Sequence, residues 1–228
     1  MAILMAFDTV FEQCSVAIVQ DDTVLYHKSV AGNRGQTEII LGMVDEALMQ
    51  TGLSLAQLDC LAFNRGPGAF SGIRINTAVV QALSVASDTP CVGVSSLAVL
   101  VDTACQSHDF ADNTVISAVM DARQNQVYHG RFVTKNGTLN RDDTDGIVGD
   151  EALLDYDSHL ICDVLVGDGV QLVQTDNAQT VQVHPTAVDI ARLGLIDFLA
   201  GKAVSADNAL PVYLRDNAWK TLAEQGKA

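Results

Sequence analysis

The chain repeats one pattern of short apolar runs, and this internal duplication limits the folds open to it more than any other feature. The first copy has three strand-like runs that follow one another across short polar turns, at residues 2–7, 14–19 and 23–28. The second copy has the same order, at residues 114–120, at residues 127–133 and from residue 138 onward. The first run of each copy ends on an aspartate, Asp8 and Asp121 respectively. The pattern predicts two β-meander units of one design.

Two meander units, each followed by helices and each with an aspartate at its first turn, resemble the actin-like (ASKHA) architecture of sugar kinases and Hsp70 proteins. The resemblance implies an α/β fold in which duplicated, ribonuclease H-like lobes contain mixed sheets flanked by helices. We expect the first lobe at residues 1–106 and the second at residues 107–228, with the C-terminal segment packing back on the first. The chain should end in an extended run at residues 211–216 and a short helix.

The same resemblance implies a vestigial nucleotide cleft between the lobes, faced by a turn from each of them. Its candidate residues are Asp8, Thr9, Asp121, Gly167, Asp168 and Gly169. Aspartate is also a favoured turn residue, so both acids can instead serve only to close their turns. The first turn, Asp8-Thr9-Val10, lacks the glycine that a phosphate-binding turn usually contains. Both interpretations stay open on the sequence.

A glycine-rich stretch joins a predicted strand at residues 60–63 to a predicted helix at residues 72–87. Its glycine spacing fits neither the Walker phosphate loop nor the dinucleotide fingerprint, and its serine is not in a nucleophile elbow. The surrounding segment carries two arginines and no carboxylate in an otherwise acidic chain, so it is a functional candidate. A tight strand-to-helix turn also explains the glycines. The candidate residues are Arg65, Gly66, Pro67, Gly68, Ser71 and Gly72.

Two predicted helices, at residues 36–52 and 72–87, are apolar around far more of their circumference than one buried stripe of about 100° requires. If both pack on one side of the first lobe, their outer faces form an apolar patch that monomers rarely expose. We therefore expect a partner interface, although burial beneath the second lobe would also explain the pattern. The candidate interface residues are Ile39, Ile40, Met43, Val44, Ala47, Leu48, Ile73, Arg74, Thr77, Ala78 and Gln81.

The charge balance limits the direct partners of the chain. It has 13 basic and 28 acidic residues, a formal net charge of −15. Such a surface repels phosphate backbones, so contact with RNA would come through another chain, although solubility alone also explains the charge. The five cysteines form no C-x-x-C pair and no signal peptide is visible, so we expect a reducing, cytoplasmic location. No uncharged apolar run reaches membrane-spanning length.

The common signatures of metal and hydrolytic chemistry are absent from the sequence. The five histidines form neither H-x-x-x-H nor H-E-x-x-H, so no helix-borne metal site is predicted. His27 and His129 fall in predicted strands and are expected to serve structure. Asp8 and Asp121 are the only paired carboxylates with a structural reason to face each other, and no catalytic residues are assigned.

Six stretches spread over nearly the whole chain carry a family resemblance. They are Phe7-Asp8-Thr9, residues 65–75 (the most specific), Gly93-Val94-Ser95-Ser96-Leu97, Asp121-Ala122-Arg123, Val166-Gly167-Asp168-Gly169 and Pro211-Val212-Tyr213-Leu214-Arg215. In this order they resemble the TsaB (YeaZ) family of bacterial tRNA threonylcarbamoyladenosine biosynthesis proteins, which is similar to the catalytic subunit TsaD.

The resemblance implies a pseudo-enzyme that pairs with TsaD through the two helices of its first lobe and stabilises or activates it. With the P-loop ATPase TsaE, the complex would transfer threonylcarbamoyl to the adenosine beside the anticodon of tRNA. ATP, magnesium and any metal are then expected on the partner subunits, and tRNA is contacted only through the complex. Alone, the chain can form a homodimer through the same patch.

One position departs from the family pattern. TsaD carries two metal-binding histidines at the start of its first helix and many TsaB chains keep one, but Gln36 stands there in this chain. A neutral amide is a poor ligand for the ions that imidazole suits, which favours the non-catalytic interpretation. The alternative function is an actin-like ATP-dependent phosphotransferase that acts on a small molecule and uses Asp8 and Asp121 around magnesium.

Overall fold

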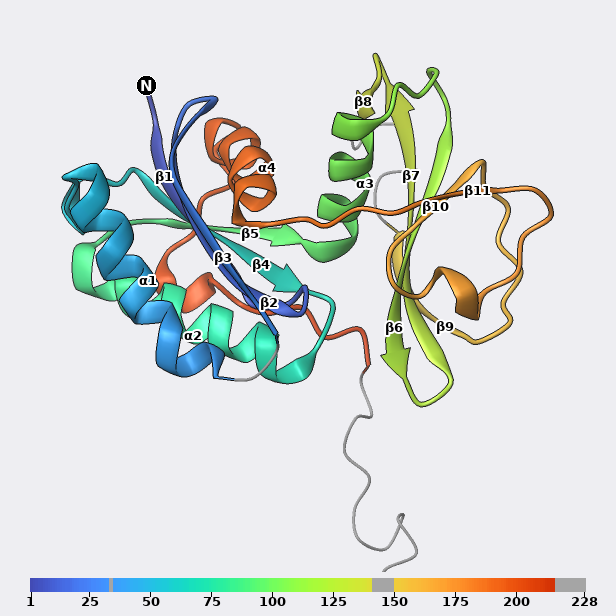
Figure 1. Cartoon of the computed structure of the whole chain (residues 1–228), viewed down its shortest axis with the longest axis horizontal. Coiled ribbons are helices and arrows are strands. Elements are labelled where there is room, and N and C mark those ends of the chain that lie inside the picture. Colours follow the sequence, from blue (N-terminus) through green and yellow to red (C-terminus); the bar gives the residue numbers. More distant parts are fainter. Residues whose placement is uncertain (33–34, 141–149, 216–228) are drawn as a thin grey trace, which may run out of the picture.

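The computed structural model describes residues 1–32, 35–140 and 150–215, which form two α/β lobes side by side (Figure 1). The sheet of the first lobe has the strand order β3-β2-β1-β4-β5. Strands β1, β2 and β3 are antiparallel neighbours, whereas β4 and β5 run parallel to β1. The strands are β1 (Ile3–Asp8), β2 (Gln13–Gln20), β3 (Thr23–Ala31), β4 (Cys60–Gly66) and β5 (Cys91–Ser95).

Helices cover both faces of this first sheet. Helices α1 (Gln36–Thr51) and α2 (Phe70–Ser87) lie side by side on one face, and α4 (Ala187–Leu199) packs on the other. Strand β1 serves both layers, because Met5 and Phe7 point to the first face while Leu4 and Ala6 point to the second. A strand buried on both faces must be apolar throughout, which explains its unbroken apolar run.

The second lobe repeats this arrangement of strands. Its described sheet has the order β11-β10-β6-β7-β8, with β9 also paired to β7. Strands β6 and β7 are antiparallel, and β10 and β11 run parallel to β6. Helix α3 (Ser96–Ser107) covers one face. The strands are β6 (Val115–Arg123), β7 (Gln126–Lys135), β8 (Thr138–Leu139), β9 (Asp150–Asp155), β10 (Val164–Val166) and β11 (Gln179–Val181).

The duplication extends to the turns, with one difference in register. In the first lobe Asp8 pairs with Ser15 across the hairpin, whereas Asp121 pairs with Val127 in the second. The second turn is therefore the shorter one, and the β6–β7 register shifts between Asp121 and Arg123. The corresponding aspartates consequently need not have the same surroundings.

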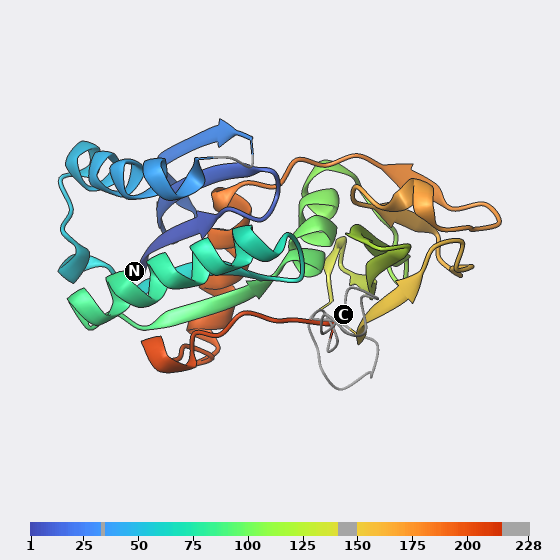
Figure 2. The same ribbon diagram turned by 90° about the horizontal axis from the view of Figure 1, so that it is seen from below.

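The chain crosses between the lobes more than once (Figure 2). After β11 it runs back to the first lobe, where α4 packs on β1, β2 and β4. Residues near Val212 then extend again toward the second lobe, with the backbone N–H of Val212 donating to the carbonyl of Arg65 at 2.8 Å. The division of the chain after residue 106 stays a prediction, and the predicted terminal helix lies outside the described residues.

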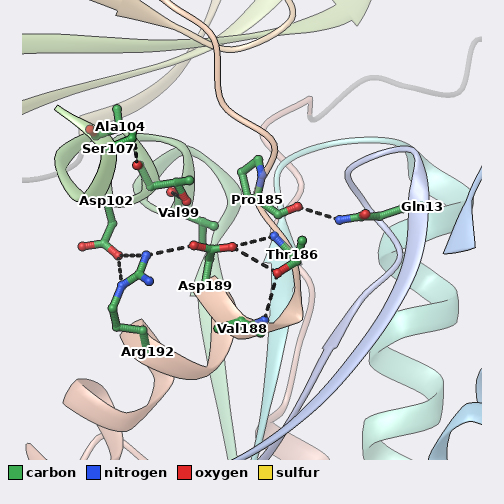
Figure 3. A network of polar contacts seen from close by, with 11 residues as sticks. Gln13, Val99, Asp102, Ala104, Ser107, Pro185, Thr186, Val188, Asp189 and Arg192 are labelled. Atoms are coloured by element: carbon green, nitrogen blue, oxygen red, sulfur yellow. Dashed lines mark hydrogen bonds and ion pairs between the residues drawn. The ribbon is translucent and has the colours of Figure 1, made fainter. Parts of the chain in front are cut away.

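A network of ion pairs joins α3 to α4 at the lobe boundary (Figure 3). Arg192 of α4 donates from Nε to Asp102 of α3 at 2.7 Å, and its Nη2 lies 3.0 Å from Asp189. Asp102 is buried, with a side-chain exposure of 7%. Nearby, the side-chain amide of Gln13 donates to the carbonyl of Pro185 at 2.6 Å, which attaches the returning chain to the first hairpin.

We expect Arg192→Met to lower the free energy of unfolding by about 3 kcal/mol, because the buried carboxylate of Asp102 loses its guanidinium partner. Urea unfolding followed by circular dichroism measures this loss. The matched control is Lys28→Met, which breaks the more exposed ion pair with Glu46 and should cost much less than the Arg192 substitution. Equal losses in the two variants would show that the Arg192 network does not hold the lobes together.

Candidate functional site

The aspartate of the first turn points into the protein. Asp8 is fully buried, and its Oδ1 accepts from the backbone N–H of Val10 at 3.1 Å and from Nδ2 of Asn64 at 2.9 Å. Its Oδ2 accepts from Phe11 N and from Gln13 Nε2 at 3.4 and 3.3 Å. Burial raises the pKa of the carboxyl from its ordinary 3.8 to about 6. The expectation that Asp8 faces the cleft is therefore wrong, because neutral donors of its own lobe surround it.

Asn64 connects this acid to three further elements. Its Oδ1 accepts from the backbone N–H of Gly66 and from the Ser96 hydroxyl at the start of α3. Asn76 of α2 donates in turn to the carbonyls of Asn64 and Phe7 at 2.9 and 3.2 Å. Together these bonds make a buried polar hub that ties β1, β4, α2 and α3. Polar residues just after predicted strands were visible in the sequence, but only the structure shows that they meet.

The glycine-rich stretch packs against the first turn. The hydroxyl of Thr9 donates to the carbonyl of Gly72 at 2.6 Å, and a Cβ on Gly72 would lie 2.1 Å from the carbonyl oxygen of Thr9. Gln36 adds two bonds, from Nε2 to the carbonyls of Thr9 and Gln13 at 3.2 and 2.7 Å. Close packing thus explains the glycine at position 72, and the Gln36 amide supplies hydrogen-bond donors to two carbonyls of the first turn.

The rest of this stretch lies between β4 and α2. Gly66 ends β4 and precedes a cis peptide bond to Pro67, while Ser71 is exposed in the first turn of α2. A Cβ on Gly68 would lie 2.3 Å from the side chain of Val10, so this glycine also packs on the first turn. Arg65 extends over Gly93 toward Glu151 of β9, whose carboxylate accepts from the Ser95 hydroxyl. No sequence pattern around Glu151 predicts this contact.

The second turn differs from the first, because its acid lines a cavity. Asp121 accepts from the hydroxyl of Tyr156 at 2.7 Å and pairs with the Arg123 guanidinium at 2.7 Å. Its backbone N–H donates to Asp168 at 3.1 Å. Burial raises the pKa of the Asp168 carboxyl. A Cβ on Gly167 would lie 2.1 Å from the carbonyl oxygen of Val119, so this loop also packs closely on its strand.

Two cavities lie between the lobes and share the wall formed by Val10, Glu12, Met120 and Asp168. The smaller, of about 460 Å³, is also lined by Gln13, Leu100, Gly167 and His184. The larger, of about 680 Å³, is also lined by Phe70, Arg74, Asp121, Arg123, Tyr213 and Arg215. Of the six predicted cleft residues, Asp121, Gly167 and Asp168 line a cavity, whereas Asp8, Thr9 and Gly169 line neither.

The predicted interface residues divide between the core and the surface. Six of them are buried within the chain itself, which corrects their assignment to an interface: Ile40, Met43, Val44, Ala47, Ile73 and Thr77. The four residues of α1 pack in the core of the first sheet, whereas Ile73 packs in the cluster that contains α3 and the second sheet. Ile39, Leu48 and Gln81 are half-buried, and Arg74 and Ala78 are exposed. The large apolar side chains that these helices do expose are others, with exposed fractions from 40% to 77%: Leu41, Met49, Phe70 and Val85.

The described residues contain no cluster of three or more His, Cys, Asp or Glu side chains that could hold a metal ion. His27 and His129 lie in β3 and β7, where each contacts a serine of the neighbouring strand, Ser15 and Ser117 respectively. In the same described ranges, no helix is both long and apolar enough to cross a membrane.

Two mixed sheets of one topology, joined by helices and separated by cavities, define an actin-like (ASKHA) α/β protein. Residues 30–194 match the family described as TsaD: tRNA N6-adenosine threonylcarbamoyltransferase. Over 96% of its length the chain is 34% identical to the tRNA threonylcarbamoyladenosine biosynthesis protein TsaB of Escherichia coli (strain K12), 97% of which is covered. The chain belongs to the TsaB family.

Further relatives agree over the whole length. The TsaB protein of Haemophilus influenzae (strain ATCC 51907 / DSM 11121 / KW20 / Rd) is 32% identical, with 96% of each chain covered. A solved structure of YeaZ from Pseudomonas aeruginosa superimposes with a TM-score of 0.81 at 31% identity, covering 94% of this chain and 100% of that one. The family and fold class indicated by the sequence motifs are therefore confirmed.

The buried carboxyl of Asp8 should make stability depend on pH. Because its pKa is raised in the folded state, that state holds the proton more tightly than the unfolded chain between about pH 4 and pH 6. Stability is lost as pH rises through this window, and the full penalty of about 3 kcal/mol applies above pH 6. Asp8→Asn removes the titration, so its free energy of unfolding relative to the wild type should rise by about 2–3 kcal/mol from pH 4 to pH 7.

Urea unfolding of both proteins at several pH values measures this difference. In Asp8→Asn, an N–H of the new side-chain amide lies beside hydrogen-bond donors, which costs free energy. This cost is the same at every pH, so it does not affect how the difference in unfolding free energy changes with pH. Parallel stability curves for the two proteins would show that the Asp8 carboxyl titrates as it does in the unfolded chain.

Proposed function

We propose that this chain is a non-catalytic subunit of the complex that forms N6-threonylcarbamoyladenosine in tRNA, and that it pairs with a TsaD-like catalytic subunit through α1 and α2. The observation that carries the proposal is the surface of these helices. Leu41, Met49, Phe70 and Val85 are exposed there, and Ala78 and Ala82 lie among them. Exposed apolar side chains on two adjacent helices indicate a surface that a protein partner covers.

The similarity to the TsaD family supports the choice of partner. Related chains can associate through equivalent faces about an approximate two-fold axis, as identical chains do in a dimer. Without such a partner, the same face can pair with a second copy of this chain. Small side chains such as Ala78 and Ala82 favour this packing, since they allow helix backbones to approach closely.

The first turn supports a non-catalytic role. A magnesium-dependent phosphotransferase of this architecture would need a carboxylate from that turn to reach the cleft, but both oxygens of Asp8 accept bonds from their own lobe. Gln36 likewise donates to two carbonyls of the turn. ATP, magnesium and any metal are accordingly assigned to the partner subunits, TsaD-like and TsaE-like.

The charge supports indirect contact with RNA. With a formal net charge of −15, the chain should repel a tRNA backbone unless another subunit supplies positive surface. We therefore place tRNA on the partners and the complex in the cytoplasm, where tRNA is modified.

We expect Ala78→Arg and Leu41→Asp to abolish pairing with the TsaD-like subunit while the chain stays folded, because each places a charge on an exposed apolar face. Size-exclusion chromatography of equimolar mixtures measures the complex. The matched controls are Ile161→Asp and Leu199→Asp, which charge apolar positions that are more exposed than Leu41, on a second-lobe loop and on α4. Unchanged complex in the first pair of variants, or loss in all four, would exclude this interface.

A reconstituted tRNA-modification assay tests the role itself. Modification should fall to background when the chain is omitted and should remain absent with the chain alone. Full activity of the TsaD-like and TsaE-like subunits without it would refute the proposed function even if the complex forms.

A further inference from the structure

One arginine interrupts the apolar outer face of α2. Four exposed residues of this helix follow one another at intervals of four positions: Phe70, Arg74, Ala78 and Ala82. Residues at this spacing form one ridge along a helix, so Arg74 lies between Phe70 and Ala78 on the same face. A protein that covers both of these neighbours therefore also covers the guanidinium of Arg74.

Two aromatic side chains hold this guanidinium in place. Its carbon lies 3.8 Å from the centroid of the Phe70 ring, and its Nε donates to the Tyr213 hydroxyl at 3.4 Å. The Phe70 and Tyr213 rings are 5.7 Å apart at an angle of 44°. Stacking fixes the plane of a guanidinium and leaves its terminal N–H groups available to a further partner.

No described acid of the chain neutralises Arg74. Among the described residues its guanidinium has no ion-pair partner, and the whole of α2 contains no carboxylate. Asp121 lines the same cavity as Arg74 but pairs with Arg123 at 2.7 Å. In a chain with 28 acidic and 13 basic residues, an exposed arginine without an acid is a local exception. Its charge is available to another molecule.

The exposed apolar side chains continue beyond the helix onto residues 209–213, here called the C-terminal run. Figure 2 shows α2 between α1 and this run. The side-chain amide of Gln81 donates to the carbonyl of Ala209 at 3.1 Å, which attaches the run to α2. Leu210 and Tyr213 are 58% and 44% exposed. Arg74 is consequently bordered by apolar side chains both along α2 and on the C-terminal run.

We infer that the TsaD-like subunit supplies a carboxylate to Arg74 when it covers α2. Covering a guanidinium removes it from water, and this costs free energy unless a group of opposite charge meets it. A carboxylate fits because it can accept two parallel N–H···O bonds from one guanidinium. This inference rests on the proposed function and adds the chemistry that the α1–α2 interface requires of its partner.

The same charge affects the choice between partners. Two copies of this chain packed with α2 against α2 would bring two Arg74 side chains to one interface, and neither helix would supply an acid. Unneutralised like charges oppose association. A partner that carries the carboxylate is therefore favoured over a second copy.

Isothermal titration calorimetry of the full chain with the TsaD-like subunit, at low and at high salt, tests the inference. We expect Arg74→Gln to weaken pairing at least about tenfold at low salt, and to make pairing less sensitive to salt, because the lost contact joins two charges. Arg131→Gln removes the same charge from β7 of the second lobe and should leave the affinity unchanged. Wild-type affinity and salt dependence in Arg74→Gln would overturn the inference.

Ala78→Arg, one helical turn away, separates this inference from the proposed interface. If Ala78→Arg abolishes pairing while Arg74→Gln pairs like the wild type, the interface stands and only the carboxylate is wrong. If Ala78→Arg also pairs like the wild type, the interface itself is wrong and the inference falls with it.

A carbodiimide, which joins an amine to a carboxylate in contact with it, identifies the acid. Arg74→Lys places a primary amine at position 74 and keeps the charge, so it should weaken pairing less than Arg74→Gln does. Mass spectrometry of the treated complex should show position 74 joined to an Asp or Glu of the TsaD-like subunit, and no such link in Arg74→Gln. No link from position 74, or a link only to a second copy of this chain, would overturn the assignment.

Discussion

The buried hydrogen-bonded pair of Asp8 and Asn64 is the contact on which most of this architecture depends. It lies near the ends of β1 and β4, and it is joined through Asn76 to the second turn of α2 and through Ser96 to the start of α3. In a nucleotide-binding relative of this fold class the same strand ends would have to face a ligand. Here Asp8 and Asn64 bond instead to groups within the chain, namely each other, the first turn and Ser96. The second lobe kept its corresponding acid, Asp121, at a cavity wall.

Most strand and helix positions could be predicted from the sequence because most elements are buried on at least one face, although β3 is largely exposed. The apolar run of β1 and the repeat of its pattern in β6 were enough to indicate two related lobes. The inward orientation of Asp8 could not be predicted, since a turn aspartate has the same sequence signature whether its side chain faces water or the core. The contact between Ser95 and Glu151 was equally hidden, because β9 lies in a stretch without apolar periodicity.

The two helices of the first lobe show a different limit. Their composition correctly indicated more apolar surface than one face needs, but not which residues lie on which face. Ile40 and Met43 turned out to pack on the sheet, whereas Leu41 and Met49 are exposed. When a helix is apolar around nearly its whole circumference, the spacing of its apolar residues does not show which face is buried. The buried face is the one that packs on the sheet. The sequence thus indicated that these helices expose apolar side chains but not which ones, and the partner interface stays a prediction.

The return of α4 to the first sheet has a consequence for biosynthesis. Leu4, Ala6, Val92 and Val94 form one face of that sheet, and the helix that covers them begins only at Ala187. On the ribosome, the amino-terminal half therefore emerges with an uncovered apolar layer and cannot complete its core until nearly the whole chain has been made. The second sheet and α3 are complete earlier, so the lobe encoded later can close first. Nascent chains of this design would depend on chaperones during that interval.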